Sequence, residues 1–400
     1  MKKPKTSLMA AMFIPWALVL LALFLDARGE TLEPLSINPD LGGPPVGIDP
    51  RVELISIIFR LAGSPEYNLG TLASYNKDIE EHFGRFKSHP AVKMAIDLRE
   101  SQRIGYNAPM DLAIHMADVL KSGGNENMSS LPGTLDERWT RKSVKEFTAE
   151  VRRFARDTQF KEFFEQHRVL YEVAQWRLKK VLLTNDIVRW VNDFFGEESD
   201  TEFFVVISML NDGNFYASRT LSPEGKQDFY CVLGVGPLDN QGIPMFGKFV
   251  IPFIVHEFAH SYVNPLVDKH AGDLQAPGER IFVHVGEAMK KQAYSTWKMM
   301  LYESLVRACV VRYFSDDPET SRRILAEDEK NGFILVGGLS KLLSEYEANR
   351  RQYPELESFC PRIVNYLENV ATQMENNATE RELMPSDEDD IQVIKEVRNE

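Results

Sequence analysis

The stretch FIVHEFAHSY, residues 253–262, decides the fold of this chain. His256 and His260 are four residues apart, so on a helix they project from one face, about one turn from each other. Glu257 directly follows the first histidine, and the remaining positions are mostly aliphatic or aromatic. This pattern predicts a buried helix that begins near Pro252 and carries three polar groups on an otherwise apolar surface.

The pattern His-Glu-x-x-His is typical of zinc sites. Two imidazoles one helical turn apart can bind one zinc ion, and the glutamate beside the first of them can reach a metal-bound water as a general base. The chain has 8 histidines in 400 residues. A chance match in such a chain is expected about once in 100 cases. We therefore predict one Zn²⁺ bound by His256 and His260, with Glu257 as the catalytic base.

A catalytic zinc site needs a third protein ligand and an open position for water. The extended form of the motif would place Gly at 263 and His at 266, but the chain has Val263 and Leu266. The absence of that histidine points to a glutamate on a following helix. Glu303 is the first candidate, because it is an acid in an apolar helical stretch with Arg307 one turn later, and Glu287 is the alternative. The competing interpretation of Glu303 is a surface ion pair with Arg307.

Several further residues are candidates for supporting roles. Asn264 lies one turn after His260 and is either a residue that supports the metal ligands or a helix cap, since Pro265 predicts that the helix ends there. His270 and His284 could act as transition-state donors or alternative ligands, but each is alone in a polar loop and is expected to be a surface residue. Four tyrosines could supply the donor that stabilises an oxyanion: Tyr230, Tyr294, Tyr302 and Tyr313.

The composition predicts a folded, acidic body. Hydrophobic residues make up 44% and charged residues 26%, which is ordinary for a globular protein. The formal net charge of -13 disfavours binding to nucleic acids, because the overall field repels phosphate backbones. Three cysteines without a metal-binding spacing, Cys231, Cys309 and Cys360, are expected to be buried apolar residues rather than disulfide partners.

The first 29 residues predict export. Lys2, Lys3 and Lys5 precede an apolar run over 8–25, the arrangement of a secretory signal peptide. We therefore expect a secreted, periplasmic or cell-envelope protein, which contacts a membrane only if this segment is retained as an anchor.

The rest of the chain divides by composition. Residues 30–50, rich in Pro and Gly, predict an extended leader, and the acidic segment 375–400 predicts a mobile tail. A body over 51–374 lies between them. Its first part, 51–200, has mainly helical spacing, and its second part, 201–374, contains the sheet and the active-site helices.

The sheet is predicted from three apolar, branched segments. Residues 203–210 and 215–219 are separated by the turn sequence Asn211–Asn214 and predict a hairpin, and 228–235 predicts a further strand. The segment 229–236 is a candidate edge strand to which an extended peptide could add. Helices are predicted over 288–314 and 339–374, with an inserted loop at 266–287. The fold class is therefore α+β, mainly helical, with a small mixed or antiparallel sheet next to the His-Glu-x-x-His helix.

The chain resembles the zincin metallopeptidases, and among them the gluzincin-like branch, through HEFAH at 256–260 and a glutamate on a later helix. It is also similar to an exported bacterial family, domain of unknown function 4932. The segments that carry this second resemblance are VELISIIFRLAGSPEY (52–67), HEFAHSYVNP (256–265), YESLVRA (302–308), NGFILVGGL (331–339) and YEANRRQYPEL (346–356). The resemblance implies a zincin-like fold and a secreted zinc metallopeptidase that hydrolyses peptide bonds. It assigns the metal to His256, His260 and Glu303, and the base role to Glu257.

Two other functions use the same residues. One is a non-catalytic envelope protein with a structural zinc site or a peptide-binding role, and the other is hydrolysis of a non-peptide amide or ester. An open fourth coordination position favours an enzyme, whereas four protein ligands favour a structural site.

Overall fold

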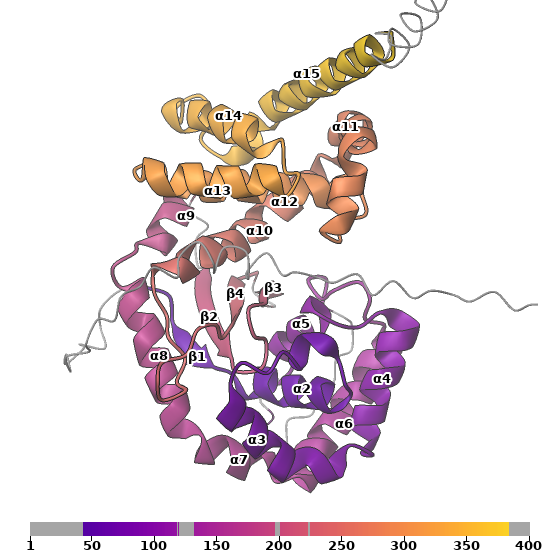
Figure 1. The fold of residues 1–400 in the computed structure, drawn as a ribbon, viewed down its shortest axis with the longest axis vertical. Coiled ribbons are helices and arrows are strands. Elements are labelled where there is room, and N and C mark those ends of the chain that lie inside the picture. Colours follow the sequence, from indigo (N-terminus) through magenta and orange to yellow (C-terminus); the bar gives the residue numbers. More distant parts are fainter. Residues whose placement is uncertain (1–42, 118, 120–131, 197–200, 223–224, 384–400) are drawn as a thin grey trace, which may run out of the picture. The chain divides into compact units, whose positions relative to one another are not determined.

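The computed structural model describes residues 43–117, 119, 132–196, 201–222 and 225–383 (Figure 1). The predicted signal peptide lies outside these residues, as do most of the predicted leader and the end of the predicted tail. The described part forms two compact units, one that ends at Tyr262 and one that begins at Val263. The single body predicted over 51–374 stays a prediction.

The first unit contains one mixed four-stranded sheet. Its strands are β1 (Val46–Ile48), β2 (Glu202–Ser208), β3 (Phe215–Leu221) and β4 (Gln227–Gly234), in the order β1-β2-β4-β3. Strands β1, β2 and β4 are parallel, and β3 pairs antiparallel with β4. With the surrounding helices, this sheet confirms the α+β class.

The predicted hairpin between 203–210 and 215–219 is wrong. Strand β3 forms its hairpin with β4, which lies between β2 and β3. The turn that follows β2 therefore passes close to the end of β4, at Gly234. A Cβ atom at Gly234 would collide with the carbonyl oxygen of Asn211, so the close approach of the two backbones depends on glycine.

Two further predictions about the sheet are corrected. The segment 229–236 is not an edge, because β4 is paired on both sides; β1 and β3 are the edges. The extended leader does not run to residue 50, because residues 46–48 pair with β2. Helix α2 begins at Pro50 and is capped by Asp49, whose side chain accepts the amide hydrogen of Arg51.

Helices make up most of the first unit before the sheet, which confirms the predicted helical first half. Four of these helices lie between residues 141 and 195. The helices are α2 (Pro50–Leu61), α3 (Ala73–Phe83), α4 (Pro90–Gln102), α5 (Asn107–His115), α6 (Arg141–Asp157), α7 (Phe160–Gln166), α8 (Arg168–Leu182) and α9 (Ile187–Phe195). Helix α5 packs on β3 and α8 packs near β1.

Helix α10 (Ile251–Lys269) contains the boundary between the units and carries the His-Glu-x-x-His motif. The helix does not end at Pro265 as predicted, but continues for four residues. A proline inside a helix removes one backbone hydrogen bond. Val263, Leu266 and Val267 on either side of it are buried, and their burial offsets this cost.

The second unit is helical. After α10 it contains α11 (Ala271–Lys291), α12 (Trp297–Tyr313), α13 (Pro318–Lys330), α14 (Val336–Ala348) and α15 (Leu356–Leu383). The loop predicted at 266–287 is therefore wrong, because most of it is α11. The helix predicted over 288–314 is interrupted between α11 and α12. Residues 375–383 belong to α15 rather than to a mobile tail, and Glu375 accepts hydrogen bonds from Arg280 of α11.

Cys231, Cys309 and Cys360 are all buried and free, as predicted. Among the described residues, none of the helices is both long and apolar enough to cross a membrane.

A buried carboxyl group joins α2 to the end of β2. Glu53 is fully buried, and its Oε1 accepts the amide hydrogen of Met209 (2.8 Å). Its Oε2 accepts the hydroxyl hydrogen of Tyr75 (2.9 Å), whose oxygen lies 2.7 Å from the hydroxyl oxygen of Tyr171. Burial raises the pKa of Glu53 from its ordinary value of 4.5 to about 7.

This pKa predicts a specific pH dependence of stability. As the pH rises from 4.5 to about 7, Glu53 ionises in the unfolded chain before it does so in the folded one. The free energy of unfolding should therefore fall over this range, by about 3 kcal/mol from this group. Glu53→Gln should lose that part of the decline, as measured by urea unfolding at pH 5 and pH 8.

The matched control is Glu80→Gln, since Glu80 is exposed on α3 and paired with Lys87 (2.6 Å). It should keep the parental pH dependence. An unchanged decline in Glu53→Gln would show that Glu53 does not titrate in this way.

Candidate metal centre

Aromatic contacts hold the first part of α10 on the sheet. Three aromatic side chains of the helix each meet one strand residue, with ring centroids 4.2–5.3 Å apart. The pairs are Phe253 with Phe215, Phe258 with Phe203, and Tyr262 with Phe229. This packing fixes the rotation of the helix, and with it the direction in which the two histidines project.

His256 and His260 point toward one another from successive turns of α10. Their Nε2 atoms are 3.0 Å apart, and the ring planes are inclined at 78°. Two nitrogen ligands of a tetrahedral zinc ion lie about 3.3 Å apart, given zinc–nitrogen bonds of about 2.0–2.1 Å. His256 is buried and His260 is half-buried. The two rings therefore match the spacing that one metal ion requires.

Glu303 of α12 is the third member of this group. One ligand atom from each of His256, His260 and Glu303 lies within 4.8 Å of the others. Helix α12 is also tied to the later turns of α10, because Tyr302 donates to Asp268 (2.5 Å), and so does Lys298 (3.0 Å). Two imidazole nitrogens and one carboxylate oxygen are the donor set of a catalytic zinc site, so this group could hold a metal ion.

The alternative ligand, Glu287, lies elsewhere. It is exposed on α11 and accepts a hydrogen bond from Lys290 (2.9 Å). The hydrophobic spacing of Ile281, Val285 and Met289 marks the buried side of α11, and Glu287 is not part of that stripe. This spacing is a signal in the sequence that distinguishes the two glutamates.

Comparison with known families agrees with the segments quoted above. The profile of the family described as Domain of unknown function (DUF4932) matches residues 45–366. The chain belongs to the DUF4932 family. The match extends from β1 into α15 and includes the whole motif helix and Glu303. Comparison with curated proteins gives no match, and neither does comparison with solved structures.

Glu257 of this DUF4932 protein is almost fully buried. Burial and, after it, the charge of Glu257 raise the pKa of the Cys231 thiol on β4. The pKa of Tyr216 on β3 is also raised, mainly by burial and to a smaller extent by the charge of Glu257. The carboxylate of Glu257 therefore lies within electrostatic reach of β3 and β4. In the helix it directly follows His256.

Arg307 is not part of a surface pair with Glu303, because both side chains are buried. The nearest atoms, Nη2 of Arg307 and Oε2 of Glu303, are 3.4 Å apart. Arg307 makes a shorter contact with Asp328 of α13 (2.7 Å), a residue that the sequence analysis did not identify. Tyr294 contacts the same group. Burial and the charge of Glu303 raise the pKa of Tyr294.

The remaining candidates are placed as follows. Asn264 is half-buried in the interior of α10, so the helix-cap interpretation is wrong. His284 is exposed on α11 rather than in a loop, and His270 precedes α11 with its Nε2 3.8 Å from Glu357. Among the other tyrosines, Tyr302 binds Asp268, Tyr230 stacks on Phe204 (4.8 Å) and Tyr313 contacts Phe314 (4.9 Å). Tyr294 lies within electrostatic reach of a predicted metal ligand, because the charge of Glu303 adds to the effect of burial on its pKa.

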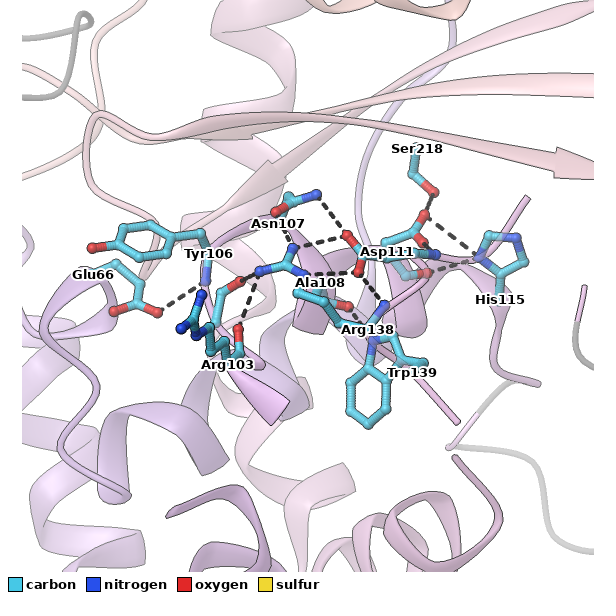
Figure 2. Close-up of polar contacts among 12 residues, drawn as sticks. Glu66, Arg103, Tyr106, Asn107, Ala108, Asp111, His115, Arg138, Trp139 and Ser218 are labelled. Atoms are coloured by element: carbon cyan, nitrogen blue, oxygen red, sulfur yellow. Dashed lines mark hydrogen bonds and ion pairs between the residues drawn. The ribbon is translucent and has the colours of Figure 1, made fainter. Parts of the chain in front are cut away.

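A second polar cluster in the first unit contains Ser218, Asp111 and His115 (Figure 2). The Ser218 hydroxyl donates to Asp111 (2.6 Å), and His115 Nδ1 lies 2.9 Å from the backbone oxygen of Asp111. His115 Nε2 lies 2.9 Å from the hydroxyl of Thr134. Because the serine donates to the carboxylate and not to the histidine, this is not a nucleophilic triad. The cluster instead fastens α5 to β3.

Proposed function

We propose that this protein is a secreted zinc metallopeptidase of the gluzincin type. The observation that carries the proposal is the convergence of His256, His260 and Glu303, three buried or half-buried donors from two helices. Buried carboxylates and imidazoles are costly unless they are paired or bind a cation. Arg307 compensates the charge of Glu303 in part, and a shared metal ion would bind the donor atoms that the three residues place within 4.8 Å of one another.

The proposal gives each of these residues a role. His256 and His260 would bind zinc through Nε2, and Glu303 through one carboxylate oxygen. When bound, zinc polarises a substrate carbonyl and lowers the pKa of a water molecule. Glu257 accepts the proton of the attacking water and passes it to the leaving nitrogen as the carbon–nitrogen bond breaks. The water oxygen stays on the carbonyl carbon and its proton goes to the nitrogen, so the products are a carboxylic acid and an amine.

Export and the class of partner belong to the same proposal. Lys2, Lys3 and Lys5 before the apolar run support a signal peptide, and the net charge of -13 supports a peptide or protein substrate rather than a nucleic acid.

The decisive experiment is the metal content of the purified protein. We expect one zinc per chain, and we expect His260→Ala to lose it. His284→Ala is the matched control, because His284 is exposed on α11 and should keep the metal. A parent protein without stoichiometric zinc after incubation with the ion, or a His260→Ala variant that retains it, would refute the metal site.

Activity is then measured with a library of quenched fluorescent peptides. Cleavage that requires zinc supports the peptidase. A zinc-loaded protein that cleaves no peptide, and whose metal has four protein ligands by X-ray absorption, would favour the non-catalytic envelope protein. Cleavage of amide or ester probes without cleavage of peptides would favour a hydrolase of non-peptide amides or esters.

A further inference from the structure

Arg307 occupies an unusual position for a cation. Its side chain is only 1% exposed, although it lies in the middle of α12. The guanidinium group stacks on the ring of Phe333, with its central carbon 3.8 Å from the ring centroid. Stacking on an aromatic ring fixes the plane of a guanidinium group and supplies a favourable interaction for a desolvated cation.

Within this plane, Arg307 meets two carboxylates through two different nitrogens. Nη1 donates to Asp328 at 2.7 Å, and Nη2 donates to Glu303 at 3.4 Å. The guanidinium group offers five N–H donors in a rigid fork, so one side chain can hold two acceptors in a defined arrangement. A lysine ammonium group has no such planar fork.

The two distances suggest different tasks. Asp328, at the shorter distance and also 1% exposed, is the charge partner of Arg307. Glu303 is held more weakly, through Oε2. A carboxylate that binds a metal must keep one oxygen available for the metal. Because Arg307 is paired mainly with Asp328, it leaves an oxygen of Glu303 available in this way. Arg307 can therefore orient the Glu303 carboxylate without occupying both of its oxygens.

We propose that Arg307, itself fixed by Asp328 and Phe333, is a positioning residue for the third metal ligand. It orients Glu303 so that one carboxylate oxygen faces the two histidines. This inference rests on the proposed metal site. Residues that orient a ligand in this way commonly change metal affinity by about 10–100-fold when they are replaced.

The test measures zinc affinity by competition with a chromophoric chelator, so it does not depend on catalysis. Arg307→Lys should weaken zinc binding by about 10–100-fold, because the fork is lost although the charge remains. The double variant Arg307→Met/Asp328→Leu should weaken zinc binding to a similar extent. It replaces a buried ion pair by apolar side chains, a change that generally leaves the fold intact.

Arg312→Lys is the matched control. Arg312 lies on the same helix and donates to Glu347 (2.6 Å), away from the three ligands. It should bind zinc like the parent. The thermal unfolding of each metal-free variant is measured in parallel, so that a loss of folded protein is not mistaken for a loss of affinity.

The outcomes separate this inference from the metal site itself. If Glu303→Gln weakens zinc binding but the folded double variant binds like the parent, then Arg307 has a purely structural role and the inference is refuted. If Glu303→Gln binds zinc like the parent, the third ligand is wrongly assigned, and the inference fails with it.

Discussion

Glu257→Gln is expected to lower the rate of peptide hydrolysis by about 10²–10⁴-fold, the usual contribution of a general base. Glutamine keeps the size and most of the hydrogen-bonding capacity of glutamate, but cannot accept a proton at neutral pH. The fold should be preserved, because the aromatic contacts that hold α10 on the sheet are made by other residues. The variant should also retain stoichiometric zinc, because Glu257 is not one of the three donors.

The measurement pairs steady-state cleavage of the best library peptide with metal analysis of the same sample. Glu287→Gln is the control, since Glu287 is exposed on α11 and should affect neither quantity. A Glu257→Gln variant with parental turnover would remove Glu257 from the mechanism. A variant that loses its zinc would indicate that Glu257 belongs to the coordination sphere instead.

Asp328→Ala is expected to produce the largest loss of stability, about 3–5 kcal/mol, because it leaves a buried cation without its nearest partner. Arg307 and Asp328 are each 1% exposed, and the contact between them is 2.7 Å. Removing one member of such a pair costs far more than the pair contributes as a whole. The weaker contact with Glu303, at 3.4 Å, compensates only in part.

Urea unfolding of the metal-free protein measures this loss directly. Glu347→Ala removes the partner of Arg312, where the two side chains are 21% and 29% exposed. Water can solvate the remaining charge there, so this control should cost no more than about 1 kcal/mol. A cost for Asp328→Ala as small as that of Glu347→Ala would mean that Arg307 is solvated or paired elsewhere.

The local features of the fold were accessible from the sequence. Branched and aromatic residues identified the segments of β2, β3 and β4, and helical spacing identified most of the first unit. Their partners were not accessible. The turn at Asn211–Asn214 resembles a hairpin turn, but β4 pairs with both neighbouring strands over their full length, and this long-range pairing outweighs the local preference of the turn.

Pro265 shows the same limit within one helix. Its local effect predicts the end of α10, yet the helix continues to Lys269 because the residues around it are buried. Backbone preference at one position is worth about 3 kcal/mol, and the burial of two or three aliphatic side chains is of similar or larger size.

The sequence by itself determined that two imidazoles lie on one face of a helix, because a spacing of four residues places side chains on the same face in any helix. It also determined that a glutamate stands next to the first of them. The apolar spacing of α11 and of the Glu303 segment already favoured Glu303 over Glu287, but only the tertiary structure decided that Glu303 comes near the histidines and what holds it. Glu287 and Glu303 are both glutamates on helices. Their difference arises from burial, from the packing of α12 and from Asp328, a residue 25 positions further along that reaches Glu303 through Arg307. Such contacts depend on three-dimensional packing between elements, which no local spacing specifies.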